Sequence, residues 1–232
     1  MVIMNSLNEV LKKELKLSGA SLVGFASLEG INGADMRYGV SVAVAIPPEI
    51  VASIHDGPNI GYYNAYHELN AKLDSIVIRG EMLLADMGYS ARAQTVASVR
   101  EFGSYRTCLP HKTVATRAGL GWIGKCALLV TKKYGSAVRI SSLITNADLE
   151  CAEPVTDSRC GQCNVCADAC PAQAVSGHLW YPGLDRDTFY DVQACRAKAR
   201  DLSKTLIDKE ITLCGKCIEV CPYTQKYLKK SH

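Results

Sequence analysis

The stretch CGQCNVCADACPAQAV, residues 160–175, decides how the last third of the chain folds. Its four cysteines, Cys160, Cys163, Cys166 and Cys170, are separated by two, two and three residues, and Pro171 follows at once. This spacing is the bacterial iron–sulfur run C-x2-C-x2-C-x3-C-P. Three thiolates in a tight loop reach three irons of one cubane, whereas the fourth lies beyond a helical turn and binds the other cluster. The stretch therefore predicts a fold built around [4Fe–4S] clusters.

A second, altered copy of the run lies downstream. The segment CGKCIEVCP, residues 214–222, superimposes on the last three cysteines of the first run and its proline, but it lacks the first cysteine. Cys195, in DVQACRAKA, is the replacement from a separate segment. Eight thiolates suit two [4Fe–4S] clusters, as in a two-cluster ferredoxin. The swapping rule assigns Cys160, Cys163, Cys166 and Cys221 to the first cluster, and Cys170, Cys195, Cys214 and Cys217 to the second.

Two other uses of the cysteines are weighed against clusters. Structural zinc also binds C-x2-C pairs, but it needs four ligands per ion and gives no reason for two cysteine triplets that each end in Cys-Pro. Disulfides do not fit a chain without a secretory signal, whose cysteines crowd into its last third. The remaining Cys108, Cys126 and Cys151 are predicted to be ordinary buried or partly buried thiols, with Cys151, nearest the cluster run, as the first exception to consider.

Composition narrows the class of protein. The 232 residues are 48% hydrophobic and 21% charged, which is ordinary for a globular protein, and the net charge of +3 is too small to argue for nucleic acid on bulk electrostatics. No apolar run approaches the roughly 20 residues of a membrane helix. The N-terminal MVIMNSLNEVLKKELKLSG lacks the continuous apolar segment of a signal peptide. A cytoplasmic protein with no membrane partner is expected.

Helix and strand patterns interleave ahead of the cysteines. Helical periodicity covers residues 5–17 and 62–87, and strand patterns cover 20–27, 38–47, 126–131 and 137–145. KKYGS is expected to join the last two strands as a hairpin-like link. The pattern predicts an α/β (α+β) core domain with a helix-covered sheet over residues 1–147, followed by a ferredoxin-like domain with two [4Fe–4S] clusters over residues 148–232.

The segment AGLGWIGKCALLVT contains Gly119, Gly121 and Gly124, a formal G-x-G-x-x-G. A dinucleotide-binding fingerprint follows a strand and opens a helix. Here the order is reversed, because TVATRA ahead of the glycines has a helical pattern and CALLVT after them a strand pattern. Dinucleotide binding is therefore disfavoured. The glycines permit either close backbone approach to a large group or a tight helix-to-strand turn.

Together, LPHKTVATRAGLGWIGKCALLVTKKYGSAVRISSLIT, the run CGQCNVCADACP, Cys195 and CGKCIEVCP resemble the epoxyqueuosine reductase family, whose core is related to reductive dehalogenases. The glycine block and the cysteine layout are the specific features, and AYHELNAKLD and SVAVAIP are weaker similarities. The resemblance implies two [4Fe–4S] clusters and a cobalamin bound against the core, which reduces an epoxide on a modified tRNA base. It places Gly119, Gly121, Trp122, Gly124 and Lys125 in the wall near the corrinoid.

The resemblance also implies a proton donor, and here the chain departs from the family. Counted back from AGLG, the family's aspartate falls on Tyr105 and the glutamate of the same motif falls on His111. Tyr105 is either the replacement proton donor, with an unperturbed pKa near 10, or a packed aromatic residue. His111 is a second candidate, or else a residue of an exposed loop. The terminal YTQKYLKKSH is typical of a solvated tail.

Three functions remain open on the sequence. The first is a small cobalamin-dependent iron–sulfur reductase, and the second an electron-transfer or corrinoid-reducing protein that hands electrons to a partner. The third is a minimal epoxyqueuosine reductase that acts on tRNA. A ferredoxin or flavodoxin type of electron donor is expected in each case. The first is preferred because a bare two-cluster ferredoxin needs far fewer residues than the chain has ahead of Cys160.

Overall fold

The computed structural model describes residues 6–230 and divides the chain into two compact units. Unit 1 combines the chain up to Val44 with Leu69–Leu120 and Arg139–Val155. Unit 2 combines Ala45–Glu68, Gly121–Val138 and the chain from Thr156 onward. The units therefore differ from the continuous division expected at residues 147 and 148, because two segments from the first two thirds of the chain complete the cysteine-rich unit.

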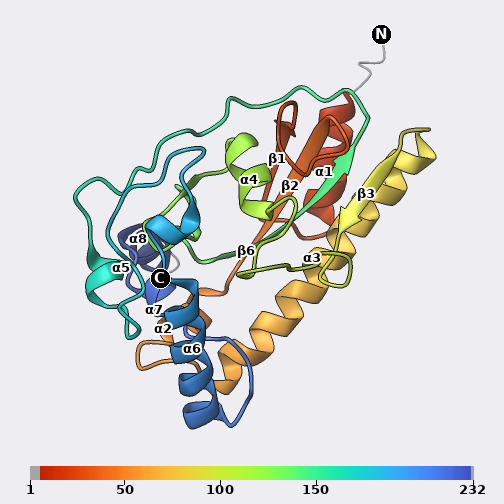
Figure 1. Ribbon diagram of the computed structural model, residues 1–232. Coiled ribbons are helices and arrows are strands. Elements are labelled where there is room, and N and C mark those ends of the chain that lie inside the picture. Colours follow the sequence, from red (N-terminus) through yellow and green to blue (C-terminus); the bar gives the residue numbers. More distant parts are fainter. Residues whose placement is uncertain (1–5, 231–232) are drawn as a thin grey trace. The chain divides into compact units, whose positions relative to one another are not determined.

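Unit 1 is built on a four-stranded sheet with the order β1-β2-β6-β3 (Figure 1). The strands are β1 (Leu22–Ser27), β2 (Tyr38–Ala45), β3 (Ala91–Gln94) and β6 (Val138–Thr145). The outer pairs are antiparallel, with Leu22 opposite Ala43 at one edge and Ala91 opposite Thr145 at the other. The α/β core with a helix-covered sheet is confirmed.

Alternate residues of β1 and β2 face two different helical layers. The residues Val23, Phe25, Val40 and Val42 pack into a core with α1 (Leu7–Leu17) and α3 (Ile60–Asp86), which contributes Leu73, Ile76 and Leu84. On the other face, Ala26 packs with Val114 and Ala118 of α4 (His111–Arg117) and its C-cap. Gly24 and Gly39 allow this approach, because an added Cβ would lie 2.6 Å from the Ala118 carbonyl oxygen and 2.8 Å from Val114 Cγ1.

The first helix begins where its sequence provides a cap. Ser6 and Glu9 form a capping box, in which the Ser6 hydroxyl accepts from the Glu9 amide and the Glu9 carboxylate accepts from the Ser6 amide. Leu11 and Leu15 are fully buried on one face of this helix. The helices predicted over 5–17 and 62–87 and the strands predicted over 20–27, 38–47 and 137–145 are confirmed within one to three residues at most ends.

Unit 2 combines helices with a two-stranded sheet. The sheet pairs β4 (Trp122–Ile123) with β5 (Leu129–Val130). The helices are α2 (Pro48–Ala52), α5 (Val165–Asp168), the 3-10 turn η1 (Arg186–Thr188), α6 (Val192–Ile207), α7 (Lys216–Glu219) and α8 (Pro222–Lys230). α7 contacts α2, α5 and α8.

Two predictions for this region are wrong. The strand expected over 126–131 is reduced to Leu129–Val130, because Gly124 donates to the Leu128 carbonyl and Ala127 adopts a left-handed φ of 59°, so that residues 124–128 form a tight turn. The KKYGS link turns back on itself, since Thr131 and Gly135 form an isolated antiparallel bridge, but the two strands that it joins do not pair with each other. β5 pairs with β4, whereas β6 lies between β2 and β3 in the other sheet.

Candidate metal centre

The eight predicted cluster ligands all belong to unit 2 and are all half-buried free thiols. Cys166 lies within α5, Cys195 in the first part of α6, and Cys217 within α7, while the others lie in the loops at the ends of these helices. Pro171 and Pro222 follow the last cysteine of each run, and Pro222 begins α8. The two runs thus fold alike, each as a one-turn helix that is followed two residues after its end by Cys-Pro.

The loop of the first run is tied to the turn after β4. The Lys125 ammonium is 4% exposed, and it donates to Asn164 Oδ1 at 2.7 Å, between Cys163 and Cys166 in the sequence. Within the loop, the Cys163 amide donates to the Cys160 carbonyl at 3.0 Å. A buried ammonium with a charge-assisted hydrogen bond fixes the loop that carries three of the predicted ligands of the first cluster.

The cysteines of the predicted second cluster come together from three segments. Cys214 interacts electrostatically with Cys195 and Cys170, although the three residues are widely separated in sequence. Cys195 is held by α6, which begins with Asp191 as its N-cap: the Asp191 carboxylate accepts from the Ala194 amide at 2.9 Å. The replacement of the missing cysteine by Cys195 stays a prediction, and the interaction of Cys195 with Cys214 is consistent with it.

The donor set fits iron–sulfur clusters. Thiolates are the standard protein ligands of [4Fe–4S] clusters, and the thiols of each run must lose their protons when the clusters bind. Among residues 6–230, no three His, Cys, Asp or Glu side chains form a ready-made site for a metal ion. The fit rests on the number and type of these side chains and on their shared location in unit 2. The spacing of the cysteines in the sequence predicted their number and type.

Two further polar side chains adjoin the ligands and were not predicted as part of the site. Cys126 is 5% exposed, and its thiol interacts electrostatically with Cys166 and Cys217. The Tyr190 hydroxyl interacts electrostatically with Cys195, and burial raises the pKa of Tyr190. Neither residue lies at a recognisable spacing from the runs, although Tyr190 is only five residues ahead of Cys195.

Of the three cysteines outside the runs, Cys126 is therefore the exception, not Cys151. Cys151 belongs to unit 1, where it packs against the sheet core, and burial and the nearby Asp148 raise its pKa. Cys108 is exposed in the same unit. Nearness in sequence to the cluster run was a poor guide, because the tight turn of residues 124–128 places Cys126 among the ligands.

The part of the glycine block from Gly121 onward is buried within unit 2. Trp122 is 1% exposed, and its ring packs edge-on against Tyr223 with centroids 4.9 Å apart, while the Arg159 guanidinium lies 5.8 Å from the ring centroid. Gly121 and Gly124 are also buried, and of the five residues expected near a corrinoid only Gly119 is exposed. The side chains of Trp122 and Lys125 thus do not fit direct contact with a bound corrinoid.

Tyr105 lies in a turn of unit 1 closed by a bridge between Phe102 and Arg106. Its ring is 38% exposed, so it is not the packed aromatic residue that one reading of the sequence expected. Its φ of 56° is left-handed, which is uncommon for a residue with a side chain and is a feature of functional sites. Its role as proton donor stays a prediction.

His111 begins α4 and is half-buried, so the exposed-loop interpretation is wrong. Its Nδ1 lies 2.8 Å from the Ser142 hydroxyl, which itself donates to Gln94 Oε1 at 2.5 Å. Because the serine proton is committed to Gln94, Nδ1 of His111 carries a proton and donates to Ser142. Burial and the charge of Arg139 lower the pKa of His111 to about 4. A neutral histidine whose Nδ1 proton is donated to Ser142 does not fit a general acid at pH 7.

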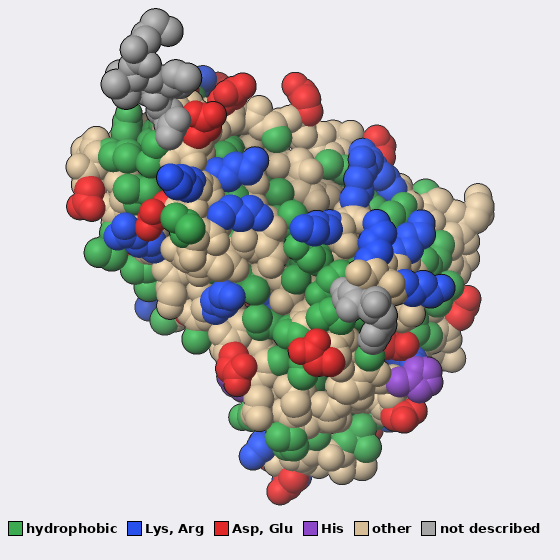
Figure 2. Space-filling model, turned by 180° about the vertical axis from the view of Figure 1, so that it is seen from behind, with side chains coloured by type: hydrophobic (Ala, Val, Ile, Leu, Met, Phe, Trp, Pro, Cys, Tyr) green, Lys and Arg blue, Asp and Glu red, His purple; other side chains and the backbone are tan. Residues whose placement is uncertain are grey.

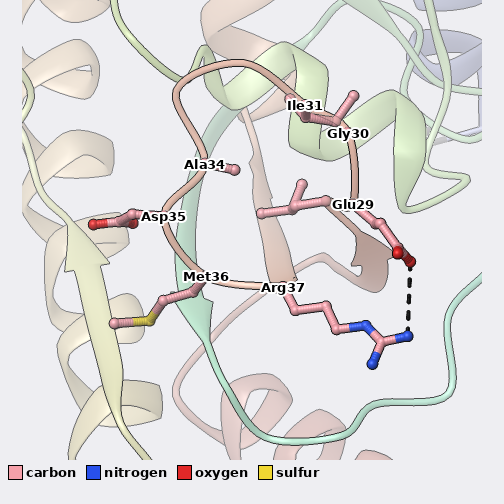
Figure 3. A pocket seen from close by; sticks show the side chains of 8 residues that line it. Glu29, Gly30, Ile31, Ala34, Asp35, Met36 and Arg37 are labelled. Carbon is pink, nitrogen blue, oxygen red and sulfur yellow. Dashed lines mark ion pairs between the residues drawn. The ribbon is translucent and has the colours of Figure 1, made fainter.

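A surface pocket of unit 1 is lined by residues 28–31 and 34–37, in the loop that links β1 and β2 (Figure 3). Glu29 and Arg37 form an ion pair at 3.6 Å across its rim, and Asp35 points to the other side of the loop, where it pairs with Arg92 at 2.7 Å. The loop contains none of the residues singled out in the sequence. Its ion pairs are exposed, which is typical of a solvated surface.

Comparison with known proteins agrees with this site. Residues 159–224 match a family of 4Fe-4S double cluster binding domains. The chain is 35% identical over 160 residues to the epoxyqueuosine reductase of Lactococcus garvieae, an alignment that covers 69% of this chain and 42% of the relative. The chain thus spans less than half the length of the curated relatives that it matches.

Two solved structures show the same fold. An epoxyqueuosine reductase bound to a tRNA-Tyr epoxyqueuosine-modified stem loop aligns with a TM-score of 0.61 and 22% identity, over 94% of this chain and 65% of the other. A reductive dehalogenase with B12-dependent dehalogenation aligns with a TM-score of 0.67 and 19% identity, over 97% of this chain and 34% of the other. Between residues 6 and 230, no helix is both long and apolar enough to cross a membrane.

Proposed function

We propose that this chain, which is similar to epoxyqueuosine reductases, is an iron–sulfur oxidoreductase whose two [4Fe–4S] clusters pass electrons to a bound corrinoid. The observation that carries the proposal is the gathering of eight predicted ligand thiols in unit 2, with Cys170, Cys195 and Cys214 brought together from distant segments. The match of residues 159–224 to double cluster binding domains supports it.

A corrinoid supplies a reduced cobalt centre that delivers electrons to a substrate. Its presence here is supported by the similarity to epoxyqueuosine reductases and by the fold shared with a B12-dependent dehalogenase. Of the residues implied by the family resemblance, Gly119 is the exposed one, at the C-terminal end of α4.

The proton that accompanies reduction is assigned to Tyr105. Its exposed ring and left-handed backbone suit a residue held toward a ligand, whereas neutral His111 is committed to Ser142. Tyr105→Phe is expected to abolish turnover and to leave corrinoid binding intact. Tyr89→Phe is the matched control, since Tyr89 belongs to the same unit and is 39% exposed against 38% for Tyr105. Unchanged turnover in Tyr105→Phe would remove the tyrosine from the proposal.

The substrate proposed for the first assay is epoxyqueuosine, free or in a tRNA stem loop, because the curated relatives bear that activity in their names. Unit 2 carries lysines suited to a polyanion on α8 and in the turn after β5, namely Lys226, Lys229, Lys230, Lys132 and Lys133. Lysine and arginine side chains at the surface are drawn in blue in Figure 2. A cytoplasmic location and a ferredoxin or flavodoxin as electron donor complete the proposal.

The decisive experiment is an anaerobic titration of the cluster-loaded chain with cob(II)alamin, followed by EPR. The proposal predicts a changed cobalamin signal that saturates at one equivalent per chain. Cobalamin spectra that stay unchanged would contradict it and would leave an electron-transfer protein that reduces a partner. Turnover of epoxyqueuosine in the tRNA stem loop but not as the nucleoside would identify tRNA as the partner.

A further inference from the structure

Two distant segments of unit 2 together present five exposed lysines, here called the lysine surface. They are Lys132 and Lys133 after β5, and Lys226, Lys229 and Lys230 on α8. The Ser136 amide donates to Thr224 Oγ1 at 3.1 Å, and the rings of Tyr134 and Tyr227 pack edge to face with centroids 5.1 Å apart. The turn after β5 and α8 therefore form one continuous surface.

The positive charge of the lysine surface has little to balance it. Residues 129–138 and 222–230 contain no Asp or Glu. Among residues 6–230, none of the five lysines forms an ion pair with a carboxylate. The neighbouring helix α2, which contacts α8, carries one carboxylate, that of the exposed Glu49. A surface of this kind attracts an acidic partner and steers its approach.

The lysine surface adjoins a predicted ligand of the first cluster. α8 follows Cys221 directly, since Pro222 is its first residue. Lys226 Nζ lies 5.3 Å from the centroid of the Tyr223 ring, and that ring packs edge-on against Trp122. A redox protein that docks on these lysines would thus lie beside the second cysteine run, where it supplies a thiol to the first cluster.

The tyrosines beneath the lysines favour a protein partner over RNA. Single-stranded RNA is bound by stacking its bases on open aromatic faces. Here Tyr134, Tyr223 and Tyr227 are half-buried and pack edge-on against other aromatic rings. Lys133 and Lys226 lie over two of these rings, so that their faces are not open. A small, charged surface with aromatic rings at its base matches the weak, electrostatically steered encounters of electron-transfer proteins.

We propose that the lysine surface docks an acidic one-electron carrier protein that reduces the first cluster. One electron passes from the carrier to the oxidised [4Fe–4S] cluster, and no bond is made or broken. The inference rests on the proposed function for the two clusters, but not for the corrinoid or the substrate. It adds the place on the chain where the electrons enter.

The test uses the full-length, cluster-loaded chain without cobalamin, and the probe is an acidic flavodoxin in its hydroquinone state. Anaerobic stopped-flow absorbance of the flavin gives the second-order rate constant of electron transfer. Lys132→Gln/Lys133→Gln and Lys229→Gln/Lys230→Gln are each expected to lower this constant about threefold at low ionic strength, and the four changes together about tenfold. Added salt should slow the wild type and hardly affect the fourfold variant, because salt screens exposed charges.

Two controls separate docking from other effects. Lys12→Gln/Lys13→Gln removes the same charge from an adjacent, exposed pair of unit 1 and should keep the wild-type rate constant. Reduced methyl viologen, a small cation, should reduce the clusters of every variant at least as fast as those of the wild type. Slower reduction of the lysine-surface variants by the viologen would place the fault in the clusters and overturn the proposal.

The kinetics also decide between a protein and RNA. Equal rate constants in the wild type and the lysine-surface variants, or a wild-type reaction that does not depend on salt, would overturn the proposal. Weaker binding of an RNA stem loop by these variants, with unchanged flavodoxin kinetics, would overturn it and assign the surface to RNA. Each of these outcomes leaves the cob(II)alamin titration unaffected, so the docking surface and the proposed function fail separately.

Discussion

At the scale of single residues, the His111 imidazole shows a polar group adapted to a half-buried place. Burial, with the charge of Arg139, lowers its pKa to about 4, and its Nδ1 proton is used by Ser142. The sequence offered a catalytic acid or an exposed loop residue, and neither is what the structure shows. The partners Ser142 and Gln94 lie on β6 and β3, at separations in the chain that leave no local pattern.

The lowered pKa of His111 predicts a pH dependence. The folded state disfavours the charged form, so the stability from neutral His111 is fully present above the unfolded pKa of 6.5 and is lost as pH falls toward 4. Between pH 7 and pH 5, the wild type should lose about 2 kcal/mol more unfolding free energy than His111→Gln. Urea unfolding at both pH values measures this difference. Equal losses in the two proteins would show that His111 titrates normally.

The Lys125–Asn164 contact predicts a second residue-scale effect. Asn164→Leu leaves a buried ammonium without its partner, which should cost about 3 kcal/mol and speed the loss of clusters in urea. The double variant Lys125→Met/Asn164→Leu removes the charge as well and should lose its clusters more slowly than Asn164→Leu alone. Cluster absorbance in urea follows the loss. If the double variant loses its clusters as fast as the added effects of Lys125→Met and Asn164→Leu would give, the two residues are not coupled.

At the scale of elements, long periodic segments were predicted well and short ones poorly. The sequence predicted α3, β1, β2 and β6, because apolar residues recur at helix or strand spacing along each of these elements. The two-residue strands β4 and β5 carry no such repeat, and their pairing depends on the turn at residues 124–128. The same turn brings Cys126 to the ligands, so the missed strand pairing and the missed cysteine have one cause.

The docking of α8 depends on a close approach at Gly135. Its φ is +58°, and an added Cβ would lie 2.2 Å from the Thr224 backbone nitrogen, within a contact where Thr224 is fully buried. Gly135→Ala should therefore lower stability by about 3 kcal/mol. Gly183→Ala, also at positive φ but with nothing within 4 Å of its added Cβ, should cost only about 1 kcal/mol. Thermal unfolding compares the two. Similar unfolding midpoints for the two variants would mean that α8 shifts to accommodate the methyl group added at residue 135.

At the scale of the whole molecule, the cysteine-rich unit is not a separable C-terminal piece. Spacing predicted the ligands that lie within the two cysteine runs, because each run is local, and Cys195 was proposed from a separate segment. Spacing could not show that Ala45–Glu68 and Gly121–Val138 complete the unit. Contacts such as Lys216 Nζ to the His55 carbonyl at 2.9 Å and Ser136 N–H to Thr224 Oγ1 at 3.1 Å join these segments to the cysteine runs. Contacts between residues so far apart in the sequence have no characteristic spacing from which they could be predicted.

This division predicts what happens when the clusters are removed. Cluster binding contributes to the folding of the unit that supplies the ligands. Amide hydrogen exchange should therefore speed up in Gly121–Val138 as well as in the chain from Thr156 onward, whereas β1 and β2 should stay protected. Hydrogen exchange with mass spectrometry compares loaded and cluster-free protein. Faster exchange confined to the cysteine runs would show that Gly121–Val138 folds independently of the clusters.

The measurement that tests the central claim most directly is the iron and sulfide content of the anaerobically loaded chain and of Cys195→Ala. Two [4Fe–4S] clusters on the eight assigned cysteines predict about eight irons and eight sulfides per chain in the wild type, and about half of each in Cys195→Ala. Cys151→Ala, which alters a thiol of unit 1, should retain the full content. Bound zinc without sulfide, or full iron in Cys195→Ala, would contradict the account.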